Sequence, residues 1–219
     1  GLWPCEELAA PPAAAAVPPA RTDFAAGNDK RANEIAASLV LVTFDMPFSV
    51  AGITERNYHG TGIVVDAERG LVVVDRNTVP VAAGDVRLTF GGSIEVPGKV
   101  EYVHPLHNLS VVSFDPKALD GTPIRAVKFD TRELEPGEPV TVVGLGGDSR
   151  LRTLATYVAT MDDVNFPLSR TLQFRDANLE VVALVNSPSE FDGVITGKDG
   201  RVRALWSSFA TEGARDAVQ

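Results

Sequence analysis

Histidine and cysteine, the residues most often used as metal ligands and catalytic groups, are scarce in this chain: three histidines and one cysteine among 219 residues. His104 and His107 stand three apart and could supply two metal ligands, but no acidic or cysteine partner lies at the usual spacing. We therefore interpret that segment as a surface turn and predict no metal centre and no cofactor. The single cysteine, Cys5, excludes an internal disulfide and a multi-cysteine zinc site.

A second candidate is the glycine-rich run GLGG at 144–147, which follows a strand-like segment as phosphate-binding loops do. No helical pattern follows it, and no Lys-Ser or Lys-Thr pair completes a nucleotide-binding loop. A turn at the end of a strand is the better interpretation.

The elements that must position any site are short aliphatic runs separated by glycine, proline and aspartate. They lie at residues 39–44, 62–65, 71–74, 86–90, 100–103 and 109–114, and again at 140–143, 153–160, 172–174, 179–185, 194–196 and 202–206. Strands at this spacing predict an all-β fold, and the lack of long amphipathic helices between them disfavours a parallel α/β sheet. Asp199-Gly200 predicts a hairpin between the last two runs. Two series of six indicate two six-stranded antiparallel β-barrels.

Composition divides the chain into unequal parts. Residues 11–20 are nearly all proline and alanine, so we expect an extended linker over residues 1–34, with a short helix near 29–39. We assign the first barrel to 35–118, the second to 119–211 and a C-terminal tail to 212–219.

Motifs in the right order resemble the trypsin-like HtrA/Deg serine proteases. GTGIVV at 60–65 and GLVVVDRNTV at 70–79 are similar to the strands that lead to the family's catalytic histidine, and NLSVV at 108–112 is similar to its aspartate motif. SEFDGVI at 189–195 takes the place of the nucleophile motif, and DGRVRAL at 199–205 looks like the hairpin that follows it. The resemblance spans residues 36–209 and implies a chymotrypsin-like fold of two barrels.

The resemblance also locates the positions of the family's catalytic groups. They hold Asn77 in place of the general base, Asn108 in place of the carboxylate and Phe191 in place of the nucleophile. An amide does not accept a proton near neutral pH, and a phenyl ring cannot attack a carbonyl. On this alignment we predict a degenerate protease domain that is not an enzyme.

The former oxyanion loop is altered as well. Ser189 and Asp192 replace two family glycines, next to Glu190 and Gly193. Glycine permits the backbone angles that let N–H groups converge, and Asp192 would add negative charge where an oxyanion develops. The loop therefore lacks the composition of a working oxyanion hole.

A shifted alignment stays open as the alternative of an active serine endopeptidase. It would recruit His107 as the base and Ser187 or Ser189 as the nucleophile. A slip of one residue reverses the face of a strand on which a side chain lies, so His107 would leave the cleft.

The match is closer to the large fungal and plant HtrA-like proteins that carry two protease-like domains and PDZ domains. That resemblance implies an active protease domain elsewhere in a longer protein, and a role in oligomerisation, scaffolding or regulation for this domain. Active family members commonly form trimers through aromatic residues near the start of the domain, where Phe24, Phe44 and Phe48 stand here. Phe44 as a core residue is the competing interpretation. The alternative function is a peptide-binding module that uses the relic cleft or a strand edge.

Charge and hydropathy limit the partners. Twenty Lys+Arg against 29 Asp+Glu give a net charge of −9, which argues against binding to nucleic acid or an anionic membrane. No apolar run approaches the roughly 20 residues of a membrane-spanning helix, and the first residues lack the order of a signal peptide. We expect a soluble chain whose compartment the sequence does not indicate.

Overall fold

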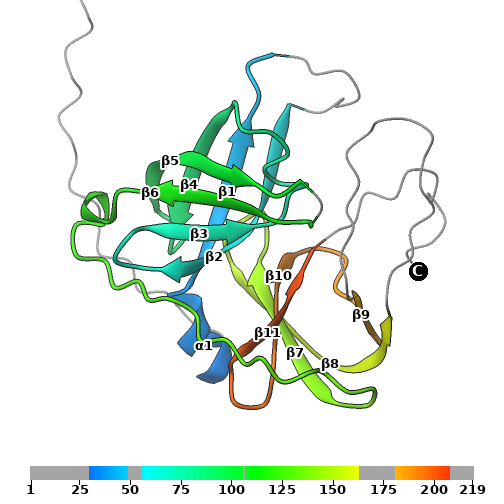
Figure 1. Ribbon diagram of the computed structural model, residues 1–219. Coiled ribbons are helices and arrows are strands. Elements are labelled where there is room, and N and C mark those ends of the chain that lie inside the picture. Colours follow the sequence, from blue (N-terminus) through cyan, green and yellow to red (C-terminus); the bar gives the residue numbers. More distant parts are fainter. Residues whose placement is uncertain (1–29, 49–55, 106, 163–180, 208–219) are drawn as a thin grey trace, which may run out of the picture.

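The structure is a computed structural model and describes residues 30–48, 56–105, 107–162 and 181–207. Figure 1 shows two β-rich lobes, the first built from residues 39–114 and the second from residues 139–206. The described strands of each lobe pair antiparallel with one another, and an isolated parallel bridge joins Phe129 to Val202. The all-β prediction is therefore confirmed.

The first lobe is a closed barrel with the strand order β1-β2-β3-β6-β5-β4. Alternation along β1 places Val40, Val42 and Phe44 inside the barrel, each with no exposed surface. The question of Phe44 is thus answered: its ring fills the barrel core. The strands are β1 (Leu39–Asp45), β2 (Asn57–Asp66), β3 (Leu71–Val74), β4 (Asp85–Phe90), β5 (Ile94–Val103) and β6 (Ser110–Phe114).

The second lobe differs from the predicted six-stranded barrel, which is only partly right. Its described strands form a five-stranded sheet in the order β11-β10-β7-β8-β9. The first barrel closes because β6 pairs with both β3 and β5, whereas no described strand pairs with both β9 and β11. The run predicted at 172–174 lies outside the described residues. The strands are β7 (Pro139–Leu145), β8 (Leu151–Asp162), β9 (Val181–Leu184), β10 (Asp192–Thr196) and β11 (Val202–Trp206).

The hairpin predicted at Asp199-Gly200 is confirmed. It joins β10 to β11, and Gly200 adopts a φ of 74°, in the region that favours glycine. The Gly200 N–H donates to the carbonyl of Gly197 at 3.0 Å, and the Asp199 carboxylate accepts from the N–H of Arg201 at 3.1 Å. Turn residues therefore act here as the local pattern predicts.

Helical structure is limited to α1 (Lys30–Ala36) and the 3₁₀ turn η1 (Pro116–Leu119). The helix is shorter than the predicted 29–39, because the chain turns at Ser38, whose N–H donates to the carbonyl of Ile35 at 2.8 Å, and Leu39 begins β1. In the described part of the chain, no helix has both the length and the apolar character required to cross a membrane.

An apolar cluster lies between the two lobes. It takes Leu39 from β1, Ile63 from β2, Val143 from β7 and Val194 from β10, all less than 3% exposed. Its other buried members are Ala32, Ile35, Val127 and Val202. Because it draws on both lobes, the burial of its apolar surface holds the lobes in a fixed arrangement.

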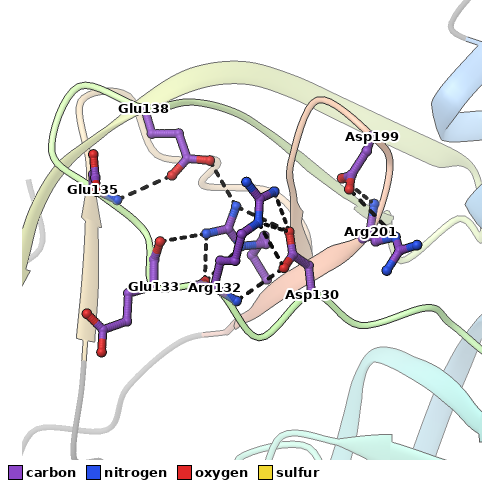
Figure 2. A network of polar contacts seen from close by, with 8 residues as sticks. Asp130, Arg132, Glu133, Glu135, Glu138, Asp199 and Arg201 are labelled. Atoms are coloured by element: carbon purple, nitrogen blue, oxygen red, sulfur yellow. Dashed lines mark hydrogen bonds and ion pairs between the residues drawn. The ribbon is translucent and has the colours of Figure 1, made fainter.

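The segment that connects the lobes is tied to β11 by a buried guanidinium. The Arg203 side chain is only 1% exposed, and its Nη2 donates to the carbonyls of Arg132 at 2.7 Å and Glu133 at 2.8 Å. Its Nη1 donates to the carboxylate of Glu138 at 2.9 Å. Figure 2 shows this network around Arg132, Asp130 and Glu138. A long segment without regular strands is thereby held by defined bonds.

Candidate functional site

The candidate site is the seam between the lobes, where two of the three aligned positions come together. Asn77 lies in the turn after β3, and Asn108 lies just before β6. The Asn108 Oδ1 accepts a hydrogen bond from the backbone N–H of Arg76, the residue before Asn77, at 2.8 Å. The structure therefore brings the turn that carries Asn77 against Asn108.

Asn108 also reaches across the seam. Its side chain is buried, and its Nδ2 donates to the Oγ of Ser207, which follows β11, at 2.9 Å. The orientation of the amide is determined, because the Arg76 N–H can only donate and requires the amide oxygen. An asparagine therefore joins the two lobes here without burying a charge.

The turn at 75–79 is held from several sides. The Asp75 carboxylate accepts from the N–H of Thr78, and the Ser110 hydroxyl donates to the carbonyl of Val79 at 2.8 Å. A Cβ on Gly60 would lie 2.1 Å from Thr78 Oγ1, so β2 approaches the turn closely only because residue 60 is glycine. Asn77 thus stands on a fixed piece of backbone.

A second set of contacts fixes the start of β10. The Thr61 hydroxyl on β2 accepts from the N–H of Leu145 at 3.0 Å and donates to the carbonyl of Asp192 at 2.7 Å. A Cβ on Gly144 would lie 1.8 Å from that same carbonyl oxygen. The backbone at Asp192 is therefore clamped between a hydroxyl and a glycine.

The loop before β10 shows where Phe191 points. Its ring is half-buried and packs against the apolar core of the second lobe, and a Cβ on Gly144 would lie 2.9 Å from its Cδ2. Ser189 and Glu190 are exposed, whereas Gly193 is buried. The Phe191 ring therefore turns inward, toward the core of the second lobe.

The shifted alignment finds no contact in the structure. The His107 N–H donates to Nδ1 of His104 at 2.8 Å, and the two rings lie 4.5 Å apart. In residues 107 and 187–190, all of which the structure describes, no hydrogen bond joins His107 to Ser187 or Ser189. Partial burial, with the charges of His107 and Arg76 nearby, lowers the pKa of His104. His104 and His107 therefore contact each other within a local turn.

Sequence reasoning named Asp192 in the former oxyanion loop but did not select His59. His59 lies on β2 beside Gly147, whose Cβ position is 3.1 Å from the His59 Nε2. Burial raises the pKa of the Asp192 carboxyl, and the charge of His59 acts against that rise. The signal that could have found His59 is the alternation of His59, Thr61 and Ile63 along one strand.

Two open hollows lie away from the seam. One of about 720 Å³ is lined by the residues around Arg132 and Arg203, and one of about 490 Å³ lies beside Tyr157 and Lys198. Among the described residues, no group of three or more His, Cys, Asp or Glu side chains could hold a metal ion. The GLGG run at 144–147 is a strand end followed by a turn, in which the Ser149 N–H donates to the Gly146 carbonyl at 2.8 Å.

Comparison with curated proteins finds relatives along nearly the whole chain, although no family model matches it. The chain is 34% identical over 218 residues to the pro-apoptotic serine protease nma111 of Aspergillus clavatus, a match that covers 97% of this chain and 21% of that protein. A PDZ domain-containing protein of Schizosaccharomyces pombe is 33% identical over 211 residues, with 94% of this chain and 21% of that protein covered. The chain spans about a fifth of the length of these relatives.

Solved structures share the fold at much lower identity. The inactive form of the Rv3671c protease superposes with a TM-score of 0.61 at 14% identity, covering 85% of this chain and 83% of that one. The active form of that protease, from M. tuberculosis, superposes with a TM-score of 0.60 at 15% identity, covering 84% and 75%. The described architecture is therefore the trypsin-like fold, with one closed barrel and one open sheet.

These relatives correct one expectation. The sequence predicted that the chain is not an enzyme, whereas proteins that match it nearly end to end are named serine proteases. The prediction rested on three positions of one assumed alignment: Asn77, Asn108 and Phe191. Their side chains exclude proton transfer and nucleophilic attack at those positions, but they do not decide whether the chain is part of a protease. The assignment of those three positions stays a prediction.

Proposed function

This chain is a homologue of HtrA-type serine proteases over nearly its whole length, and from that premise we propose that it acts in proteolysis as one domain of such a protease. Its part is to hold an extended segment of a polypeptide in the seam between the lobes. The observation that carries the proposal is the hydrogen bond from Asn108 to Ser207, because it sets the separation of the lobes at the point where a polypeptide would enter. A binding surface whose geometry is fixed before the polypeptide arrives saves the entropy of ordering it.

The free edge of β11 supports the same proposal. Val202, at the start of that strand, already exchanges hydrogen bonds with the carbonyl of Lys128 and the N–H of Asp130, at 2.8 and 3.0 Å. Residues 204–206 continue the strand to Ser207 at the seam, and no other described strand pairs with their outer edge. An extended segment added to a strand edge binds through its main chain, which suits polypeptides of varied sequence.

Hydrogen exchange with and without a fluorescently labelled, unfolded casein peptide tests this proposal. We expect saturable binding and added protection at residues 59–61, 189–193 and 204–207. Tyr157→Ala, in the hollow beside Lys198, is the matched control and should bind the peptide as the unchanged chain does. Protection confined to residues 132–138, or no saturable binding, would contradict the proposal.

Labelling with a fluorophosphonate tests the alternative that this chain is an active serine endopeptidase. Peptide-bond cleavage needs a nucleophile and a base, and peptide mapping identifies the serine that reacts. Stoichiometric labelling of Ser187 or Ser189 would favour the alternative in which this chain supplies the nucleophile through a shifted alignment.

Self-association is a second candidate function, and one observation favours it. Phe48, just beyond β1, is 43% exposed, although Phe44 is fully buried. Phe24 lies outside the described residues. An exposed aromatic ring beside the first barrel would bury apolar surface in an assembly, and we retain the trimer as the proposed form.

A further inference from the structure

The seam changes in character from its interior to its mouth. Along β2, Ile63, Thr61 and His59 lie on one face, because alternate residues of a strand share a face. Ile63 is 1% exposed in the cluster between the lobes, Thr61 forms the cross-lobe hydrogen bonds, and His59 is exposed. This row of side chains on β2, here called a column, therefore changes from an apolar side chain at Ile63, through the hydroxyl of Thr61, to the ionisable ring of His59.

A second column faces it from β10. Val194 has no exposed surface and belongs to the same cluster, and Asp192, two residues earlier, lies on the same face. Asp192 pairs with Leu145 of β7, whose side chain packs against that cluster. His59 and Asp192 thus end the two facing columns at the mouth of the seam.

The Asp192 carboxyl is poorly provided for in this position. Among the described residues, its side chain makes no hydrogen bond and no ion pair, and the residue is half-buried. Burial raises the pKa of this carboxyl, and His59 is the one titratable group of the described chain whose charge opposes that rise. The carboxylate therefore lacks the donors that a buried anion needs.

The position of the carboxyl is nevertheless well determined. Its backbone carbonyl is held by Thr61 and approached by Gly144, and the opposite wall is set by His59 against Gly147. A group held in place without a partner is suited to a ligand that brings the missing donors. One carboxylate and one imidazole are too few ligands for a structural metal site.

We propose that His59 and Asp192 form a subsite for a basic side chain, that of lysine or arginine, in the polypeptide that the seam holds. This inference rests on the proposed function and adds the class of substrate to it. The cation donates hydrogen bonds to the Asp192 carboxylate, and the His59 ring forms the opposite wall of the subsite. An acidic side chain at the same position is repelled by Asp192.

Two probes test the subsite. The first is butylguanidinium, which presents the arginine head group alone, and it is compared with the uncharged butylurea by NMR titration of the 219-residue chain. We expect butylguanidinium to shift the resonances of His59 and Asp192 saturably, and butylurea not to. The second is a pair of extended peptides that differ only by lysine or norleucine, measured by fluorescence anisotropy.

The variants separate the subsite from the fold. The unchanged chain should prefer the lysine peptide by about tenfold, the gain expected from one charge-assisted hydrogen bond, and Asp192→Asn should remove the preference while retaining the norleucine peptide. Asp199→Asn, at the exposed hairpin, makes the same change of charge and should keep the preference.

The outcomes distinguish the two proposals. A shift of His59 and Asp192 by butylguanidinium without binding of either peptide would support the cation subsite and refute the holding of polypeptides. Equal binding of both peptides by the unchanged chain, or identical titrations with butylguanidinium and butylurea, would overturn the subsite while leaving the proposed function in place.

Discussion

Asn108 and Ser207 lie 99 residues apart in the sequence and are joined by a hydrogen bond of 2.9 Å across the seam. The same amide accepts from the Arg76 N–H at 2.8 Å. One buried side chain therefore couples the turn after β3, the start of β6 and the end of β11.

A double-mutant cycle measures this coupling. Asn108→Ala leaves the Arg76 N–H without its acceptor and should lower the free energy of unfolding by about 1–3 kcal/mol. Ser207→Ala should cost about 0.5–1.5 kcal/mol, and the double variant should cost less than the sum by about 1 kcal/mol. Urea denaturation gives the three values. Additive costs would show that the bond contributes nothing of its own.

Gly144 should not tolerate alanine. The added methyl group would lie 1.8 Å from the Asp192 carbonyl oxygen, which is backbone and cannot move alone. We expect Gly144→Ala to lower the free energy of unfolding by about 1–3 kcal/mol, as overpacking does, and to perturb the resonances of residues 191–193. Gly197→Ala is the control, since its methyl group meets the Asp199 side chain at 3.2 Å. Equal stability of the two variants would contradict the close approach.

Asp130 should contribute to stability against acid. The hydrogen bonds from the Arg132 side chain, and then from its backbone N–H, lower the pKa of the Asp130 carboxyl from 3.8 to about 2. Since the folded-state pKa is the lower one, the stabilisation is present above pH 3.8 and is lost as the pH falls toward 2. Asp130→Asn should therefore flatten the fall of the urea midpoint in that range.

Glu95→Gln, at an exposed carboxyl, is the control for removing one negative charge. The Asp130 prediction is refuted when Asp130→Asn and Glu95→Gln give the same acid limb as the unchanged chain.

Asp192 should show the opposite dependence on pH. Burial raises the pKa of this carboxyl above 3.8, so the folded state disfavours the charged form and loses stability once the carboxyl of the unfolded chain ionises. Asp192→Asn should raise the urea midpoint at about pH 7 and leave it unchanged at about pH 3, where the group is protonated in both states. An unchanged midpoint at the higher pH would show that the carboxyl is solvated.

Much of this architecture follows from local pattern. The alternation in residues 39–44 and 71–74 predicts strands, and the Asp199-Gly200 pair predicts its hairpin, because both signals depend on neighbouring residues. The open second sheet does not follow, since closure depends on which strand lies between β9 and β11. Nor does the placement of His59 and Asp192 at the same end of the seam, because it depends on the tertiary contact between β2 and β10 that the hydrogen bond from Thr61 to the Asp192 carbonyl makes.

The assembly proposal can be tested at one residue. Phe48 is 43% exposed, and its replacement by serine removes an apolar ring without disturbing the barrel core. Light scattering at micromolar concentration should show a trimer for the unchanged chain and a smaller species for Phe48→Ser. Added salt should favour the trimer, because it screens a net charge of −9. A strictly monomeric unchanged chain would remove the assembly proposal.

The buried guanidinium of Arg203 has a consequence for how the chain is cut by proteases. Arg132 is an exposed arginine in a segment without regular strands, yet its carbonyl, the group that trypsin must attack, accepts two hydrogen bonds from Arg203, at 3.2 and 2.7 Å. Cleavage there requires the network to open first. The carbonyl of Arg150, exposed in the turn between β7 and β8, accepts one hydrogen bond, from the backbone N–H of Gly146 at 2.9 Å, and its side chain makes only a 3.9 Å ion pair to Asp148. Under limited digestion with trypsin, we therefore expect cleavage after Arg132, in the segment between the lobes, to be slower than cleavage after Arg150.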